Sequence, residues 1–214
     1  MKTLFIPAKC EGKVKLDKKI IDKLPKRIGL VTTVQFVEHL DDIKRQLEKH
    51  NKKVLIGKGK QQYKGQVLGC DFSSAESIAD KVDCFLYFGS GKFHPIGLAL
   101  KTKKEVFILM PVTHSFSMID KKDIEEHEKK KKVSLMKFYS ADNVGILVST
   151  KPGQYNLKKA IELKKKSKKK CYIFVSDMIN EAELENFPFI QAWVNAACPR
   201  IESKKIVNVE DLSF

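Results

Sequence analysis

Two cysteines in this 214-residue chain stand directly after short apolar runs, where a thiol could reach a ligand. Cys70 follows the run Gly65–Gly69, and Cys198 follows Val194–Ala197. Thiolates are the usual protein ligands of zinc and of iron–sulfur clusters. No Cys-x-x-Cys pair is present, so any metal site must gather cysteines from distant positions. The alternatives are a buried structural cysteine at Cys70 and a plain loop cysteine at Cys198.

The other three cysteines give weaker signals. Cys84 lies within an apolar run beside Asp83, and Cys171 begins one after several lysines, so both are interpreted as structural. Cys10 lies in a stretch rich in lysine and glycine. An odd number of cysteines in a chain with no recognisable export signal argues against a disulfide framework. We therefore expect reduced cysteines and a cytoplasmic location.

A glycine-rich segment, Gly89-Ser90-Gly91-Lys92-Phe93-His94, joins an apolar strand to an apolar helix expected over Ile96–Leu100. Such a turn exposes backbone N–H groups at the positive end of a helix, where an anion can bind. The segment matches neither the Walker A spacing nor the Rossmann spacing. His94 is either an anion or substrate contact, or a loop histidine bonded to the backbone.

A second polar loop follows the apolar run Val144–Val148. Pro152 and Gly153 predict a tight turn, and Ser149, Thr150 and Gln154 offer polar groups beside it. A plain turn with helix-capping residues is the alternative.

The two residues after Cys198 could also help to form a binding loop. Pro199 stiffens the turn, and Arg200 can pair with a carboxylate.

These loops need a scaffold, and the pattern of apolar runs predicts one. Short, nearly continuous apolar runs are typical of strands that are buried on both faces. They alternate with segments of helical periodicity, which predicts an α/β fold with parallel sheets flanked by helices. The expected strands are Thr3–Pro7, Ile28–Thr33, Val54–Ile56, Val67–Gly69, Cys84–Gly89, Val106–Pro111, Val144–Thr150, Cys171–Ser176 and Ile190–Asn195, and the expected longer helices are Phe36–His50, Asp120–Phe138 and Tyr155–Lys166.

A weak internal repeat indicates two homologous small domains, residues 1–112 and 113–214. Both copies begin with a glycine-bearing apolar strand, starting at Ile28 and at Val144, followed by hydroxyl residues and a glutamine. If the repeat is real, Cys70 and Cys198 stand at equivalent strand ends. Ligands in open α/β sheets bind beyond the carboxyl ends of the strands, so the two cysteines would meet in one shared site. Chance similarity between two βαβ units is the alternative.

The net charge of +15 comes mostly from dense runs of lysine. A solvated surface explains such runs, and they could also steer the chain to an acidic protein partner. Arginine, which base recognition favours, occurs only at positions 27, 45 and 200, so we do not expect direct nucleic-acid binding. No apolar run is long enough to span a membrane.

Taken together, the motifs resemble one family. The segments GQVLGCD, FGSGKFHPIGLAL, VSTKPGQ and ACPRI occur in this order, after LFIPAK and IGLVTTVQ. This combination is similar to that of the diphthamide biosynthesis proteins, the 2-(3-amino-3-carboxypropyl)histidine synthases of archaeal type. The resemblance implies three homologous α/β domains, each supplying one cysteine to a 4Fe-4S cluster that binds S-adenosylmethionine. It also implies transfer of a 3-amino-3-carboxypropyl group to a histidine of translation elongation factor 2.

By position, Cys70 matches the cysteine of the family's middle domain and Cys198 that of its last domain. The resemblance leaves the family's first domain unmatched, so the third thiolate would come from Cys10, from a separately encoded domain or from a paralogous subunit. It implies a homodimer or heterodimer. The alternatives are an accessory or electron-relay subunit of that enzyme and a basic α/β module that binds RNA. The residues expected to hold S-adenosylmethionine are Ser149, Thr150, Pro152, Gly153, Gln154, Gly89, Ser90, Gly91, His94 and Arg200.

Overall fold

The computed structural model describes residues 4, 6–12, 14–111, 113–201 and 203–212. Its backbone contacts divide the chain into two compact units, here called the N-terminal unit (up to Ile124) and the C-terminal unit (from Glu125). This division falls within the helix α5 (Lys121–Ser140). The domain boundary expected after residue 112 stays a prediction, and residue 112 itself lies outside the described residues.

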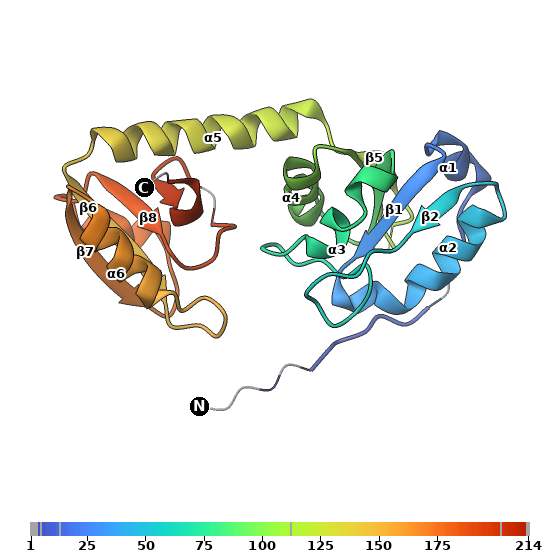
Figure 1. Cartoon of the computed structure of the whole chain (residues 1–214), viewed down its shortest axis with the longest axis horizontal. Helices are drawn as coiled ribbons and strands as arrows, with labels where there is room; N and C mark the ends of the chain where they lie inside the picture. The colour runs from blue at the N-terminus through green and yellow to red at the C-terminus, as the bar shows by residue number, and fades with distance from the viewer. Residues whose placement is uncertain (1–3, 5, 13, 112, 202, 213–214) are drawn as a thin grey trace. The chain divides into compact units, whose positions relative to one another are not determined.

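The N-terminal unit is a five-stranded sheet with helices on both faces (Figure 1). The strand order is β2-β1-β3-β4-β5, and all pairs are parallel except β4–β5. Helices α1 and α2 pack against one face, and α3 and α4 against the other. The strands are β1 (Arg27–Thr32), β2 (Lys53–Leu55), β3 (Cys84–Phe88), β4 (Glu105–Leu109) and β5 (Phe116–Met118), and the helices are α1 (Lys18–Lys23), α2 (Leu40–Glu48), α3 (Ser73–Glu76) and α4 (Phe93–Thr102), with short 3-10 turns η1 (Val34–His39) and η2 (Ala79–Lys81).

The C-terminal unit is a four-stranded, wholly parallel sheet of order β7-β6-β8-β9. Residues of α5 and α6 fill the core on one face of this sheet. On the other face, the described residues provide only the 3-10 turn η3 and the chain beside it as cover. The elements are β6 (Asn143–Ser149), β7 (Lys170–Ser176), β8 (Ala192–Asn195), β9 (Ile206–Asn208), α6 (Leu157–Lys166), η3 (Glu181–Asn186) and η4 (Val209–Asp211).

The two sheets share a strand arrangement and one packing detail. β1 and β6 each lie between the strand that follows them and a later parallel strand. Gly29 on β1 pairs with Phe85, and Gly145 on β6 pairs with Trp193. A Cβ at Gly29 would lie 2.4 Å from the Phe85 ring, and one at Gly145 would lie 2.3 Å from the Trp193 ring. Both glycines therefore leave room for a neighbouring aromatic ring, a shared feature that favours the proposed repeat.

The α/β fold with mainly parallel sheets is confirmed, but one expected strand is wrong. Val67–Gly69 forms no strand; isolated bridges join Gln66, just before it, to Thr32, and Leu68, within it, to Asp71. In the expected strand Thr3–Pro7, Thr3 and Phe5 lie outside the described residues, and Leu4, Ile6 and Pro7 have no regular secondary structure. The sequence reasoning missed β5 and β9, because strands of three residues carry little periodic signal.

Candidate functional site

Cys70 lies at the tip of a tight turn at the carboxyl edge of the N-terminal sheet. The Leu68 N–H donates to the Asp71 carbonyl at 2.9 Å, and the Asp71 N–H donates back to the Leu68 carbonyl at 3.2 Å. The turn is attached to β1, because the Val67 N–H donates to the carbonyl of Thr32, the last residue of that strand, at 2.8 Å. Cys70 is exposed at this tip. The turn therefore presents its side chain beyond the sheet rather than within the core.

Asp71 fixes the far side of this turn. Its carboxylate accepts hydrogen bonds from the Ser73 backbone N–H at 2.9 Å and the Gln61 side-chain amide at 2.6 Å. Partial burial by itself raises the pKa of Asp71, but these hydrogen bonds and nearby Lys60 outweigh burial and lower it. Asp71 therefore stays ionised and ties the turn that carries Cys70 to Gln61 and Ser73.

The glycine-rich loop after β3 lies at the carboxyl edge of the same sheet. Gly91 has a φ of +71°, a conformation that favours glycine. Gly89 leaves room for the Tyr87 side chain, since a Cβ at this position would lie 2.6 Å from the Tyr87 hydroxyl.

Tyr87 connects this loop to the core. Its ring is 1% exposed and stacks on His94 with 5.9 Å between ring centroids, and its Oη lies 3.4 Å from His94 Nδ1. Burial raises the pKa of Tyr87 to about 12, although a hydrogen bond with Thr33 partly opposes the increase. Tyr87 is thus a neutral phenol that orients His94, a role the sequence reasoning missed.

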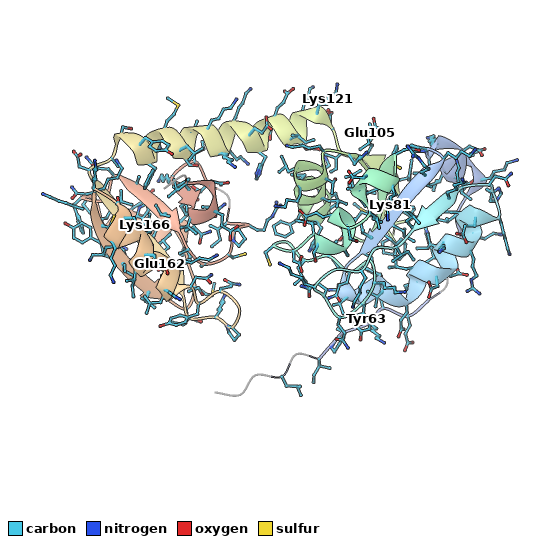
Figure 2. The ribbon with its side chains drawn as sticks, in the orientation of Figure 1. Tyr63, Lys81, Glu105, Lys121, Glu162 and Lys166 are labelled. Carbon is cyan, nitrogen blue, oxygen red and sulfur yellow. The ribbon has the colours of Figure 1, made fainter. Side chains whose placement is uncertain are left out.

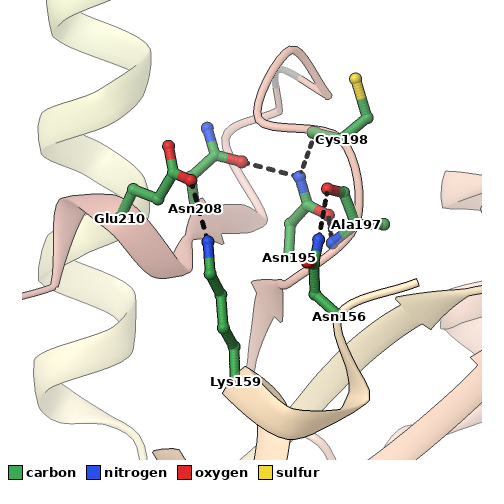
Figure 3. Close-up of polar contacts among 7 residues, drawn as sticks. All are labelled: Asn156, Lys159, Asn195, Ala197, Cys198, Asn208 and Glu210. Carbon is green, nitrogen blue, oxygen red and sulfur yellow. Dashed lines mark hydrogen bonds and ion pairs between the residues drawn. The ribbon is translucent and has the colours of Figure 1, made fainter. Parts of the chain in front are cut away.

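Cys198 lies in a loop held by two asparagines (Figure 3). The Asn195 Oδ1 accepts from the Ala197 N–H at 2.8 Å, and its Nδ2 donates to the Cys198 carbonyl at 2.5 Å and to the Asn208 Oδ1 at 2.7 Å. Asn208 in turn donates to the Pro199 carbonyl at 2.8 Å. Figure 3 shows the Cys198 sulfur directed away from these contacts. The network holds the backbone of the loop and leaves the thiol available.

The loop at residues 149–154 belongs to the same edge of the C-terminal sheet. The Ser149 hydroxyl donates to the Asp177 carbonyl at 3.0 Å and accepts from the Lys151 N–H at 3.2 Å. Gly153 has a φ of +79° with open space around it. Thr150 contacts the Asp177 carboxylate at 3.3 Å, so this hydroxyl is also engaged.

Asn156 joins this loop region to Cys198, because its Nδ2 donates to the Ala197 carbonyl at 3.4 Å. The structure therefore gathers Ser149, Thr150, Pro152, Gly153, Gln154, Cys198 and Arg200 at one edge of the C-terminal unit, and Cys70, Gly89, Ser90, Gly91 and His94 at one edge of the N-terminal unit.

The expected equivalence of Cys70 and Cys198 is wrong. Cys198 follows β8, whose counterpart in the N-terminal unit is β3, because both strands pair with the glycine-bearing central strand. Phe85 and Trp193 are equivalent, since each pairs with the glycine of the central strand. Ser90 follows Phe85 at the same interval at which Cys198 follows Trp193, so Cys198 corresponds to Ser90 in the glycine-rich loop. Cys70 instead lies between β2 and β3. The two cysteines share a carboxyl edge in their respective sheets but occupy different connections.

The remaining cysteines are less suited to a metal site. Cys84 is fully buried, and burial, reinforced by the charges of Asp83 and Glu105, raises the pKa of its thiol to about 12. Cys171 is 8% exposed within the core of the C-terminal unit. Cys10 is exposed, and its backbone N–H donates to the Gln35 carbonyl at 2.8 Å. Among the described residues, no three His, Cys, Asp or Glu side chains form a metal-binding group.

The lysine-rich runs lie mostly on exposed surfaces. Figure 2 shows Glu162 and Lys166 on α6, and both are exposed. Lys169 has a structural role, since its ammonium donates to the carbonyls of Tyr139 and Ala141, at 2.9 and 2.6 Å. Across the described parts of the chain, no helix is both long enough and apolar enough to cross a membrane.

Comparison with known proteins shows the family of this α/β protein. The sequence model of the family described as putative diphthamide synthesis protein matches residues 1–207. The chain therefore belongs to the diphthamide synthesis protein family.

Its relatives include the 2-(3-amino-3-carboxypropyl)histidine synthase of Pyrococcus horikoshii, 37% identical over 93% of this chain and 59% of that protein. The synthase of Methanocaldococcus jannaschii is 26% identical over 94% of this chain and 56% of that protein. The crystal structure of Dph2 from Pyrococcus horikoshii with a 4Fe-4S cluster matches with a TM-score of 0.78 and 35% identity, over 89% of this chain and 57% of that one. The chain thus spans less than two thirds of these relatives' length.

Proposed function

We propose that this chain is a component of the enzyme that transfers a 3-amino-3-carboxypropyl group from S-adenosylmethionine to a histidine of translation elongation factor 2. The observation that carries the proposal is the pair of cysteines on fixed loops, one at the carboxyl edge of each sheet. Cys70 and Cys198 have this placement in a family where a relative was solved with a 4Fe-4S cluster. An accessory or electron-relay subunit of that enzyme is the competing function.

The two thiols fit the chemistry of an iron–sulfur cluster. A cysteine ligand must be deprotonated and accessible, and the loop that carries it must be held in place. Cys70 and Cys198 are exposed and half-buried, respectively, and both loops are held by backbone hydrogen bonds. When bound, the cluster supplies the electron that breaks a carbon–sulfur bond of S-adenosylmethionine. The protein's own residues bind and orient the cofactor and exclude competing reactions.

The polar loops are the proposed cofactor contacts. S-adenosylmethionine carries a carboxylate and an amine, which need hydrogen-bonding partners. Gln154 and the Ser149–Gly153 backbone are our first choices for these groups. The open space around Gly153 and Gly91 allows a ligand to approach the backbone at both loops. Arg200 and His94 are the proposed charged and aromatic contacts.

A third thiolate remains to be assigned. We propose Cys10, a separately encoded domain or a paralogous subunit as its source, with the working form a homodimer or heterodimer in the cytoplasm. Cys10 is exposed and is tied to Gln35, in the 3-10 turn that follows β1.

Anaerobic reconstitution with iron and sulfide tests the proposal. We expect thiolate–iron charge-transfer absorbance from the chain, alone or mixed with a full-length homologue that keeps its first-domain cysteine and has its other two cysteine ligands replaced by serine. Cys70→Ser and Cys198→Ser should each remove it, whereas Cys171→Ala, which alters a buried cysteine of the C-terminal core, should retain it. Full iron loading in the Cys70→Ser, Cys198→Ser double variant would overturn the assignment.

Transfer of label from aminocarboxypropyl-labelled S-adenosylmethionine to elongation factor 2 then separates the two functions. A catalytic component loses transfer when Cys198 is replaced, with the partner intact. An accessory subunit retains transfer through the partner and changes only its rate of reduction.

A further inference from the structure

Asn195 is an unusual residue for its position. It ends β8, a strand with four buried residues, and is itself only 2% exposed. A buried amide costs free energy unless its hydrogen-bonding groups are satisfied, and an apolar side chain is the simpler choice in such a strand. The amide must therefore contribute something that an apolar residue cannot.

The hydrogen bonds of Asn195 all go to one small region. Its oxygen holds the Ala197 N–H, and its nitrogen holds the Cys198 carbonyl and the Asn208 oxygen (Figure 3). The amide thus spans the backbone immediately before Cys198 and at Cys198 itself. Through Asn208, which donates to the Pro199 carbonyl, the network also holds the residue that follows.

Asn208 is supplied by the neighbouring strand. It is the register partner of Asn195 in the β8–β9 pair, so the sheet itself fixes the distance between the two amides. Neither side chain contacts the Cys198 sulfur among the described hydrogen bonds, and the sulfur is directed away from them.

We propose that Asn195 is a positioning residue, which together with Asn208 fixes the backbone of residues 197–199 so that the Cys198 thiolate is held in one direction to bind iron. The inference rests on the proposed function for Cys198 as a ligand. The new element is the residue that holds the ligand in place. Residues that hydrogen-bond to metal ligands commonly orient them in this way.

The N-terminal unit uses a different residue at the corresponding position. Tyr87 stands two residues after Phe85, as Asn195 stands two residues after Trp193. Tyr87 is also buried, and it contacts Thr33, which follows β1, and His94, in the first turn of α4. A buried polar side chain at this strand position therefore orders the following loop in both units, and in the C-terminal unit that loop carries the cysteine.

The test is residue-resolved alkylation of the 214-residue chain, measured by mass spectrometry. Asn195→Leu keeps the branching at Cγ and removes all three side-chain hydrogen bonds. Cys70 is the internal reference for reagent and pH, and buried Cys171 reports opening of the whole C-terminal unit. Val194→Ala is the control variant, since Val194 is a fully buried neighbour in β8 whose loss destabilises the sheet without touching the loop.

Cys198 is half-buried where Cys70 is exposed, so loosening its loop should increase its access to the reagent. We expect Asn195→Leu to raise the Cys198-to-Cys70 alkylation ratio by about tenfold, the equivalent of one net hydrogen bond, while Cys171 stays protected. Asn208→Ala should act in the same direction and more weakly. Val194→Ala should leave the ratio unchanged. An unchanged ratio in Asn195→Leu would overturn the inference.

Iron content after reconstitution distinguishes failure of the inference from failure of the proposed function. If Cys198→Ser does not reduce iron loading, the ligand assignment fails whatever the alkylation ratio shows. If Cys198→Ser removes iron and Asn195→Leu changes neither the alkylation ratio nor the rate of iron loss to a chelator, only the positioning role fails.

Discussion

The two units have central sheets of similar strand order, but they are covered differently. The N-terminal sheet has helices on both faces, whereas the C-terminal sheet has α5 and α6 on one face and mainly η3 and its flanking chain on the other. Around this thinner cover, Tyr172, Val175, Met178 and Phe189 are between 40% and 64% exposed. The comparison shows that strand order alone does not determine how firmly a parallel sheet is enclosed. Two predictions test this contrast directly, and two further ones concern the N-terminal unit.

The largest change in stability should come from truncating one leucine in the elements that cover each sheet. Leu98 of α4 is fully buried in the N-terminal unit, whereas Leu184 of η3 is 8% exposed on the thin face. We expect Leu98→Ala to lower the free energy of unfolding by about 4 kcal/mol and Leu184→Ala by about 2 kcal/mol.

Trp193 is the single tryptophan of the chain, so its fluorescence in denaturant follows the C-terminal unit, and circular dichroism follows both. Equal losses at the two positions would contradict the difference in cover.

The matched glycines give the next largest effect. Gly29→Ala pushes a methyl group against Phe85, which is fully buried, whereas Gly145→Ala meets Trp193, which is 5% exposed beside the thin cover. We expect losses of about 3 and about 1 kcal/mol, because the Trp193 ring has more room to shift. Denaturant unfolding measures both losses. Adding Phe85→Leu to Gly29→Ala should restore part of the lost stability. Failure of that rescue would show that the clash is not with the ring.

The third effect depends on pH and concerns the N-terminal unit. Burial raises the pKa of Cys84 from 9.0 to about 12 and that of Tyr87 from 10.0 to about 12. A raised pKa means that the unfolded chain loses these protons first, so their contribution is fully present below pH 9 and is lost as pH rises toward 12.

From the raised pKa of Cys84 we expect it to account for about 1.4 kcal/mol of lost stability by pH 10. Cys84→Ala should flatten the decline in a denaturation series from pH 8 to pH 10. An equally steep decline in that variant would assign the effect to other groups.

The smallest effect concerns the ion pair that ties the first turn of α5 to the glycine-rich loop. Lys92 Nζ lies 2.8 Å from Asp123 Oδ2, and this hydrogen bond holds the pKa of the Asp123 carboxyl below its ordinary value. The stability that this ion pair contributes is therefore present above the ordinary carboxylate pKa, and it is lost as pH falls through the lowered pKa of Asp123.

Because the pair is partly exposed, we expect Asp123→Asn to cost about 0.5 kcal/mol at neutral pH and nothing at pH 2. Thermal unfolding at low and high salt would measure it. A loss that persists at acid pH would indicate a role in helix capping instead.

Much of the scaffold was predictable because its signals are local. Continuous apolar runs predicted seven of the strands that form, including β3 and β6, and helical periodicity predicted α2, α5 and α6. The polar loops were also found from sequence, since glycine, proline and hydroxyl residues mark turns after strands.

The strand expected at Val67–Gly69 failed for a reason that the sequence does not show. Val67–Gly69 has the composition of a strand, yet only Val67 reaches the sheet, through the Thr32 carbonyl, and the chain then turns back at Cys70. Whether an apolar segment pairs with neighbours depends on which strand edges are open, and that is a property of the folded sheet.

The sequence by itself determined the α/β class, the family motifs and the choice of Cys70 and Cys198 over three other cysteines. These follow from residue type and spacing along the chain. Only the tertiary structure decided that the two cysteines occupy different connections, that Tyr87 and Asn195 share a strand position, and that Asn208 reaches the Cys198 loop from β9. These relations depend on the pairing of strands distant in sequence, so strand register creates them and no local pattern encodes them.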